Sequence, residues 1–313
     1  MLARTASSLF WLARYMERAD YLARLLQVAG HMSAVRFDAD NNSEWESAIV
    51  ASGSQQAFFE KHASANPETV VSFLAFDRDN PSSICNCIET SRRNARAVRT
   101  ALTTDMWEAV NTSWMELRDF EAGEMTEDRI TEFLDWVKAR TSLVHGVYAN
   151  TMLRRDGFHF TRLGQFLERA DNTARLLDVK YHVRLPTVQD VGGVVDYYQW
   201  LAILRVLGAR RAYRVLFKGQ VEPVHVAELL LLRLEFPRSL AFCFEQICLN
   251  LDPISSQDSE LSAECKRIAH KQFAELRYGR IEDIIERGLH EYLSELIERC
   301  ALLGEQIARG HNF

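Results

Sequence analysis

A ten-residue segment occurs twice in this chain of 313 residues. Residues 17–26 read ERADYLARLL and residues 168–177 read ERADNTARLL, so eight of the ten positions are identical. Shorter matches follow in the same order: Trp45 with Trp200, Gly53 with Gly208, Pro67 with Pro223, 81–89 with 237–245, and 116–118 with 275–277. The offset between matched residues rises slowly from 151 to 159, which indicates a duplicated unit with small loop insertions. We expect two related halves, residues 1–155 and 156–313, packed as a pseudo-symmetric pair within one compact domain.

Helical periodicity dominates the chain. Apolar residues recur at spacings of three and four, and no segment shows the sustained apolar–polar alternation that indicates a strand. The chain has only 14 Gly and 6 Pro, fewer than turn-rich β folds use. The sequence therefore predicts an all-α fold, an internally duplicated multi-helix bundle of about a dozen helices. Breaks between helices are expected at 38–42, 66–67, 79–81, 155–157, 186, 192–193, 219–223, 237 and 252–253.

Charge and composition exclude several classes of protein. The net charge of −6 disfavours nucleic acid as a partner. No apolar run approaches the ~20 residues of a membrane span, and the apolar run before Arg14 is too short for a secretion signal. We therefore expect a cytoplasmic protein with no membrane partner, whose six cysteines are reduced and buried. The oligomeric state is left open.

Charged residues of the repeated helix lie both opposite its apolar arc and at the edge of that arc. On a helical wheel, Glu17, Asp20 and Arg24 lie opposite the apolar arc, whereas Arg18 lies at its edge. An arginine pressed against apolar neighbours needs a buried anion from another helix or from a ligand. The second copy repeats this arrangement. The candidate ligand-binding or ionic-lock residues are Arg14, Glu17, Arg18, Asp20, Arg24, Glu168, Arg169, Asp171 and Arg175.

Three interpretations of these residues stay open. The first is a central ionic lock, in which a glutamate of one half meets an arginine of the other. The second is a polar cavity that holds a charged ligand. The third is an enzyme with Glu17 and Glu168 as acid/base residues and Arg18 and Arg169 as anion clamps. Closed ion pairs would favour the lock, and open space between the charges would favour a ligand.

The segment 1–20 and the second copy at 163–175 resemble the alpha-E domain family of bacterial all-helical proteins with a Glu-Arg motif. The resemblance covers essentially the whole chain. It implies a partnership with a circularly permuted ATP-grasp protein and with a transglutaminase-like protease, in a pathway that makes or modifies peptides. It implies no defined activity for the helical protein itself.

Other polar patterns are weaker. Arg92 and Arg96 share one predicted helix face, as do Arg211 and Arg214, and either pair could bind an anion or simply face solvent. One Glu-x-x-His pattern, at Glu222, falls short of a di-iron site, so no metal is expected.

The chain also has no P-loop, no G-x-G-x-x-G and no G-x-S-x-G motif, so no cofactor and no catalytic residue is assigned. Our leading hypothesis is a non-enzymatic accessory subunit that positions a carboxylate or docks an ATP-grasp ligase. The alternatives are a stand-alone enzyme and a purely structural scaffold.

Overall fold

The computed structural model of the chain describes residues 2–34, 43–123, 126–182, 193–254 and 260–313. Fifteen α-helices, a π-helical segment (η1) and a 3-10 segment (η2) occur in these residues, and no strand occurs there. The all-α prediction is confirmed. The number of helices exceeds the expected dozen mainly because of short helices such as Gln55–Phe59, Pro67–Val71 and Ile281–Arg287.

The helices of the first half are α1 Ala3–Ser33, α2 Ser43–Ser52, α3 Gln55–Phe59, α4 Pro67–Val71, η1 Ser72–Phe76, α5 Ile84–Ala97, η2 Arg99–Ala101, α6 Thr104–Glu121 and α7 Glu127–Thr151. Those of the second half are α8 Asp156–His182, α9 Val194–Val206, α10 Arg210–Phe217, α11 Pro223–Leu231, α12 Leu240–Leu251, α13 Glu260–Tyr278, α14 Ile281–Arg287 and α15 Leu289–Gly310.

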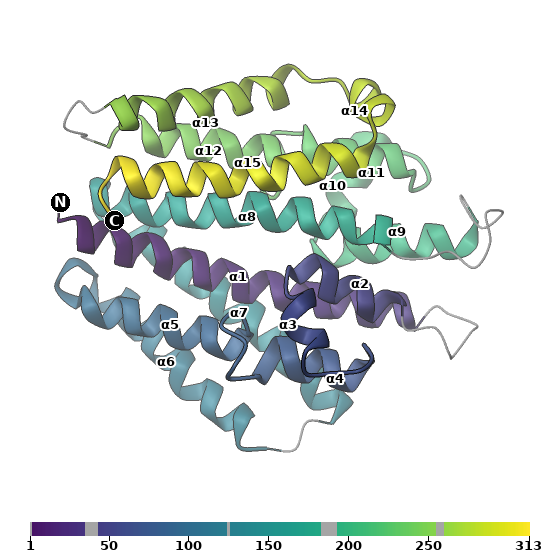
Figure 1. The fold of residues 1–313 in the computed structure, drawn as a ribbon, viewed down its shortest axis with the longest axis horizontal. Coiled ribbons are helices and arrows are strands. Elements are labelled where there is room, and N and C mark those ends of the chain that lie inside the picture. Colours follow the sequence, from purple (N-terminus) through teal and green to yellow (C-terminus); the bar gives the residue numbers. More distant parts are fainter. Residues whose placement is uncertain (1, 35–42, 124–125, 183–192, 255–259) are drawn as a thin grey trace.

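Two long helices, α1 and α8, lie side by side through the middle of the molecule (Figure 1). On one side, α1 packs against α5 and α7. On the other side, α8 packs against α12 and α15. Helices α6 and α13 lie further out, against α7 and α15 respectively. The two repeated segments are therefore at the centre of the fold, one on each central helix.

Matched positions of the two halves adopt the same local conformation. Ser83 caps the N-terminus of α5 by accepting from Asn86 N, and Ser239 caps α12 by accepting from Phe242 N. Gly53 and Gly208 end α2 and α9 with φ angles of 71° and 68°, a region that favours glycine. These parallels agree with the duplication and with the division at residue 155, both of which stay predictions from the sequence.

Most expected breaks fall between helices. Asn66 caps α4 with Pro67 as its first residue, and 79–81, 219–222, 237 and 252–253 lie outside the helices. The break expected at 155–157 lies slightly earlier, because α8 already begins at Asp156. The breaks at 38–42, 186 and 192 lie outside the described residues.

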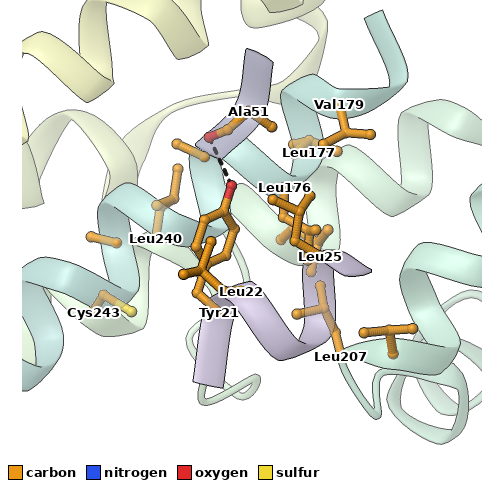
Figure 2. Packing of buried hydrophobic residues seen from close by; sticks show 14 of the residues in the cluster. Tyr21, Leu22, Leu25, Ala51, Leu176, Leu177, Val179, Leu207, Leu240 and Cys243 are labelled. Atoms are coloured by element: carbon orange, nitrogen blue, oxygen red, sulfur yellow. Dashed lines mark hydrogen bonds between the residues drawn. The ribbon is translucent and has the colours of Figure 1, made fainter. Parts of the chain in front are cut away.

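The core is continuous across the two central helices. Figure 2 shows Tyr21, Leu22 and Leu25 of α1 beside Leu176 and Leu177 of α8. The Tyr21 hydroxyl donates to the carbonyl oxygen of Ala51 at 2.9 Å, which satisfies a buried polar group near the end of α2.

All six cysteines are free and buried, as predicted. Burial raises the pKa of both Cys87 and Cys243 to about 12, so these thiols are neutral packing groups. Within the described residues, no helix is both long enough and apolar enough to span a bilayer.

Candidate functional site

Helices α1 and α8, which carry the two Glu-Arg segments, pack together at the centre of the fold (Figure 1). The two backbones come very close at Gly164 of α8, because a Cβ atom built there would lie 2.1 Å from the carbonyl oxygen of Phe10. Only a residue without a side chain fits such an approach. The helix crossing therefore brings polar side chains of one half within reach of the other.

Glu168 of α8 is held by two arginines of α1. Arg14 Nε lies 2.7 Å from Glu168 Oε2, and Arg18 Nε lies 2.6 Å from Oε1. Arg18 also donates from Nη1 to Ser82 Oγ at 3.3 Å. The Arg14 guanidinium lies over the Trp11 ring, 4.8 Å from its centroid. We call Glu168, Arg14, Arg18 and Ser82 the Glu168 cluster.

Glu17 of α1 is held in the reverse direction. Arg169 of α8 donates to it twice, from Nε to Oε1 and from Nη2 to Oε2, both at 2.8 Å. Arg238, just before α12, has Nη1 3.4 Å from Oε1, and His145 of α7 has Nε2 3.5 Å from Oε2. We call Glu17, Arg169, Arg238 and His145 the Glu17 cluster. Every oxygen of Glu17 and Glu168 thus faces a nitrogen, although the two side chains are only 1% and 2% exposed.

The aspartates of the repeated segment make local pairs in both halves. Asp20 Oδ2 accepts from Arg24 Nε at 2.7 Å and from Arg238 Nη2 at 2.9 Å, and Oδ1 accepts from Thr141 Oγ1 at 3.2 Å. Asp171 accepts from Arg175 at 2.7 and 3.3 Å. Asp20 is thereby joined to the Glu17 cluster through Arg238.

The arginines of these local pairs also reach into the opposite half. Arg24 donates to the carbonyl oxygen of Val206, the last residue of α9. Arg175 lies beside Gly53, just after α2, where a Cβ atom would be 3.3 Å from its Nη1. A cation at the C-terminus of a helix is favourable because carbonyl groups are unpaired there. The cross-half contacts therefore extend along most of the two repeated segments.

The carboxylates stay ionised despite their burial. Burial alone would raise the pKa of Glu168, but the guanidinium groups of Arg18 and Arg14 hold it at about 2. Burial would also raise the pKa of Glu17, but the charges of Arg169, His145 and Arg238 lower it. The net effect is a lowered pKa of Glu17. A general base works best with a pKa near the working pH. The two glutamates are therefore weak bases in this arrangement.

Burial lowers the pKa of the other two members of the Glu17 cluster, His145 and Arg238, because it disfavours their charged forms. Burial lowers the pKa of His145 to about 4, although Glu17 opposes the change. Burial also lowers the pKa of Arg238, with Asp20 opposing it. His145 is therefore a neutral imidazole at neutral pH, and the positive charge around Glu17 comes from the two arginines.

The sequence profile of the Alpha-E family, described as a predicted alpha-helical domain with a conserved ER motif, matches residues 1–311. The chain belongs to the Alpha-E family. In one-letter code, ER is the dipeptide found at 17–18 and at 168–169.

Curated relatives of this chain include larger proteins. The uncharacterized proteins Mb2597 of Mycobacterium bovis and Rv2567 of Mycobacterium tuberculosis are each 24% identical to this chain over 315 residues. Each match covers 94% of this chain and 35% of the relative. The chain thus spans about a third of the length of the curated relatives it matches. No solved structure matches it.

The helical wheel of this Alpha-E chain gave no indication of Arg238, His145, Ser82 or Thr141. A signal for two of them existed, because Arg238 and Ser82 each follow the proline of a matched block, Pro237 and Pro81. His145 and Thr141 had no such signal. They lie on α7, and only the packing of α7 against α1 brings them to Glu17 and Asp20.

The two basic strips of the Alpha-E chain lie elsewhere. Arg92 on α5 donates to Asn111 Oδ1 at 2.8 Å and covers the Trp114 ring at 3.8 Å from its centroid. Arg96 is exposed on the same helix, and Arg211 and Arg214 are exposed on α10. None of these four arginines contacts either cluster in the described part of the chain, and their role in anion binding stays a prediction.

Histidines outside the two clusters pair with single carboxylates. His225 pairs with Glu222 at 3.4 Å, and His290 pairs with Asp178 at 2.7 Å. Among the described residues, no group of three or more His, Cys, Asp or Glu side chains is placed to hold a metal ion.

Proposed function

We propose that this Alpha-E chain is a non-catalytic helical scaffold, whose Glu-Arg segments fix its two halves to each other and which serves a larger assembly as an accessory subunit. The observation that carries the first part is the reciprocal pairing of the two glutamates. Arg14 and Arg18 of one half hold Glu168, and Arg169 and Arg238 of the other half hold Glu17.

Closed pairs of this kind support a lock over a ligand cavity. A ligand-binding carboxylate or guanidinium needs hydrogen-bonding capacity left over for the ligand. Here the four oxygens of the two glutamates are already engaged, and both side chains are almost wholly buried. The lowered pKa of Glu17 and of Glu168 also weakens the alternative in which they act as general bases.

Two observations support an accessory role. The curated relatives place a similar segment within a chain about three times as long, so the segment works there beside other sequence. This chain has none of the nucleotide-binding motifs that would let it use ATP by the common routes. We infer that a circularly permuted ATP-grasp protein, the partner implied by the family resemblance, supplies the ATP chemistry, and that this chain organises or positions its substrate.

Co-purification with the ATP-grasp protein tests this function. We expect the purified full-length chain to bind the ligase in size-exclusion chromatography and to change its ATP turnover. Glu168→Gln should weaken both effects in proportion to the loss of folded scaffold, and Asp171→Asn, on the same helix and outside both clusters, is the matched control.

The alternatives make different predictions. If the ligase neither binds the chain nor changes its turnover in the chain's presence, the accessory role is wrong. If Glu17→Gln abolished a turnover by the isolated chain while leaving its unfolding curve unchanged, the stand-alone enzyme would be the correct interpretation.

A further inference from the structure

A small cleft opens between α13 and α15, over a floor from α12. Its volume is about 180 Å³. Phe244 of α12, Ile268 of α13 and Leu303 of α15 form its apolar surface. None of the residues that line it belongs to the Glu17 or Glu168 cluster, so the cleft is separate from the helix crossing.

One polar group in the cleft has no partner. Gln272 of α13 is 4% exposed, and its Oε1 accepts a hydrogen bond from Arg299 Nη1 at 2.8 Å. Because a guanidinium can only donate, the amide oxygen must face Arg299. The Nε2 amino group is then turned away from Arg299, and it has no hydrogen-bond partner. A buried donor without an acceptor is destabilising, and so its presence beside a cavity points to an acceptor that comes from outside the chain.

The charges around the cleft indicate which acceptor. Three cations line it, Arg267, Lys271 and Arg299, against one carboxylate, Glu275. Arg299 and Glu275 hold each other at 2.7 Å, and Arg267 is held by Glu264 at 2.6 and 2.7 Å. Lys271 is the loosely held cation, because its Nζ is 3.9 Å from Glu275 Oε1 and its side chain is 70% exposed. Because carboxylates already hold both arginines, Lys271 is the lining cation that is left to attract an anion.

We propose that this cleft binds a small organic carboxylate that carries an apolar group. The carboxylate accepts from Gln272 Nε2 and is attracted by Lys271, and the apolar group packs on Ile268 and Leu303. A hydrogen bond between an amide donor and a charged acceptor is among the stronger ones in proteins, and the apolar surface adds burial that inorganic anions cannot provide.

The matched residues of the first half make different contacts. Glu116 and Arg140, matched with Glu275 and Arg299 at the same offset of 159, also form an ion pair between neighbouring helices. There, however, Trp136 donates from Nε1 to Glu116 Oε2 at 2.8 Å and stacks on Phe133. Ser113, at the position of Gln272, donates to its own helix at Ala109 O. The second half therefore carries an unpaired amide donor at a position where the first half has a serine bonded to its own helix.

The probe for this site is N-acetyl-L-leucine, with its neutral amide, N-acetyl-L-leucinamide, as the matched ligand control. Calorimetric titration of the full chain should show saturable binding of the acid, and the amide should bind at least about tenfold more weakly. In ¹⁵N-labelled protein, the side-chain amide resonances of Gln272, assigned by their loss in Gln272→Met, should move as the acid saturates the site.

Variants separate the two contacts. Gln272→Met keeps the length of the side chain and should weaken binding of the acid about tenfold or more. The urea midpoint should change little, because the variant removes an unsatisfied donor together with the hydrogen bond from Arg299, which keeps its contact with Glu275. Lys271→Gln should weaken binding about threefold to fivefold. Lys266→Gln removes the same charge from α13 outside the cleft and should leave binding unchanged.

Several results would overturn the proposal. These are equal binding of the acid and the amide, an equal loss in Lys266→Gln and Lys271→Gln, Gln272 resonances that stay in place at saturation, and no saturable binding of the acid at all. Saturable binding of inorganic phosphate in place of the acid would assign the cleft to a different anion and would equally contradict it.

Discussion

Glu17 and Glu168 occupy matching positions in the two repeated segments, but different residues neutralise them. Glu168 is paired with Arg14 and Arg18, which both come from α1. Glu17 is paired with Arg169 of α8 and with Arg238 from outside the repeated helix, and His145 completes its surroundings. The two buried carboxylates are thus each neutralised by arginines, but these arginines come from different parts of the fold.

The predicted duplication aligns the residues behind this difference. At the offset of the repeated segment, Arg14 aligns with Gln165, so the second copy lacks one arginine. At the offset of the capped helices, Arg238 aligns with Ser82, so the missing charge is supplied from there. His145 aligns with Gly304, and a Cβ atom at Gly304 would lie 3.4 Å from Arg14 Nη1. The common requirement is neutralisation of a buried carboxylate, and the identity of the second cation is free to change.

The largest expected effect is the loss of a motif carboxylate. Glu17→Gln and Glu168→Gln should each lower the free energy of unfolding by about 3–5 kcal/mol. Glu168→Gln leaves Arg14 and Arg18 without their anion, and Glu17→Gln leaves Arg169 without its anion, whereas Arg238 keeps Asp20. Glu17→Gln should cost more, since Arg169 is 11% exposed whereas Arg18 is 24% exposed. Urea unfolding followed by circular dichroism measures both.

A second substitution checks the origin of that loss. Adding Arg14→Met to Glu168→Gln should recover part of the stability, because an unpaired charge is removed. Stability losses below about 1 kcal/mol for both glutamate variants would show that the pairs behave like exposed ones, and the lock would then be wrong.

The close crossing of α1 and α8 gives the next largest effect. Gly164→Ala should lower the free energy of unfolding by about 3 kcal/mol, because its new methyl group meets the backbone of Phe10. Gly146→Ala, in α7 with open space around it, is the matched control and should raise stability by about 0.5–1 kcal/mol. If the two variants unfolded alike, the helices would not be close enough for the reciprocal pairs.

Asp20 and Asp171 occupy matching positions of the repeated segment but differ in burial. They therefore test whether burial determines how much stability is lost when the carboxylate is removed. Asp20→Asn should cost about 2 kcal/mol, since Asp20 is 2% exposed and binds both Arg24 and Arg238. Asp171→Asn should cost less than about 1 kcal/mol, since the Asp171 side chain is 17% exposed. Equal losses in denaturant unfolding would contradict the difference between the two halves.

The Glu17 and Glu168 clusters should also differ in how stability depends on pH, because His145 belongs to the Glu17 cluster alone. The pKa of His145 falls from 6.5 to about 4 in the folded chain, so the unfolded chain binds more protons between these values. Stability should therefore fall as the pH drops from about 6.5 to about 4, by at most about 1.4 kcal/mol per pH unit. His145→Gln should flatten this part of a plot of unfolding free energy against pH.

Glu168 should act at lower pH. Its pKa of about 2, below the ordinary 4.5, gives stability that is lost as the pH falls from about 4.5 towards 2. Glu168→Gln should reduce this second decline, to which Glu17 with its own lowered pKa also contributes, and should leave the His145 range intact. A single decline shared by both variants would show that the clusters do not titrate separately.

Periodicity predicted the all-α fold, and the repeated segment identified the family. The wheel also showed that Arg18 needs an anion from elsewhere, and the structure places Glu168 there. Periodicity could not tell which helix lies opposite, because the spacing within one helix carries no information about its neighbour. Arg238 and His145 were missed for the same reason, since each reaches Glu17 only through the packing of α12 or α7 around the central helices. The Gln272 cleft had no sequence signal, because an unsatisfied donor is a property of packed neighbours.

The exchange of arginines across the centre makes each half incomplete without the other. A fragment ending near Leu153, which is 77% exposed between α7 and α8, would carry Glu17 without Arg169 or Arg238, and its complement would carry Glu168 without Arg14 or Arg18. The peptide bond at that junction contributes little to holding the molecule together. A chain cut there should stay assembled, and the two fragments produced together should find each other, whereas either one alone should aggregate.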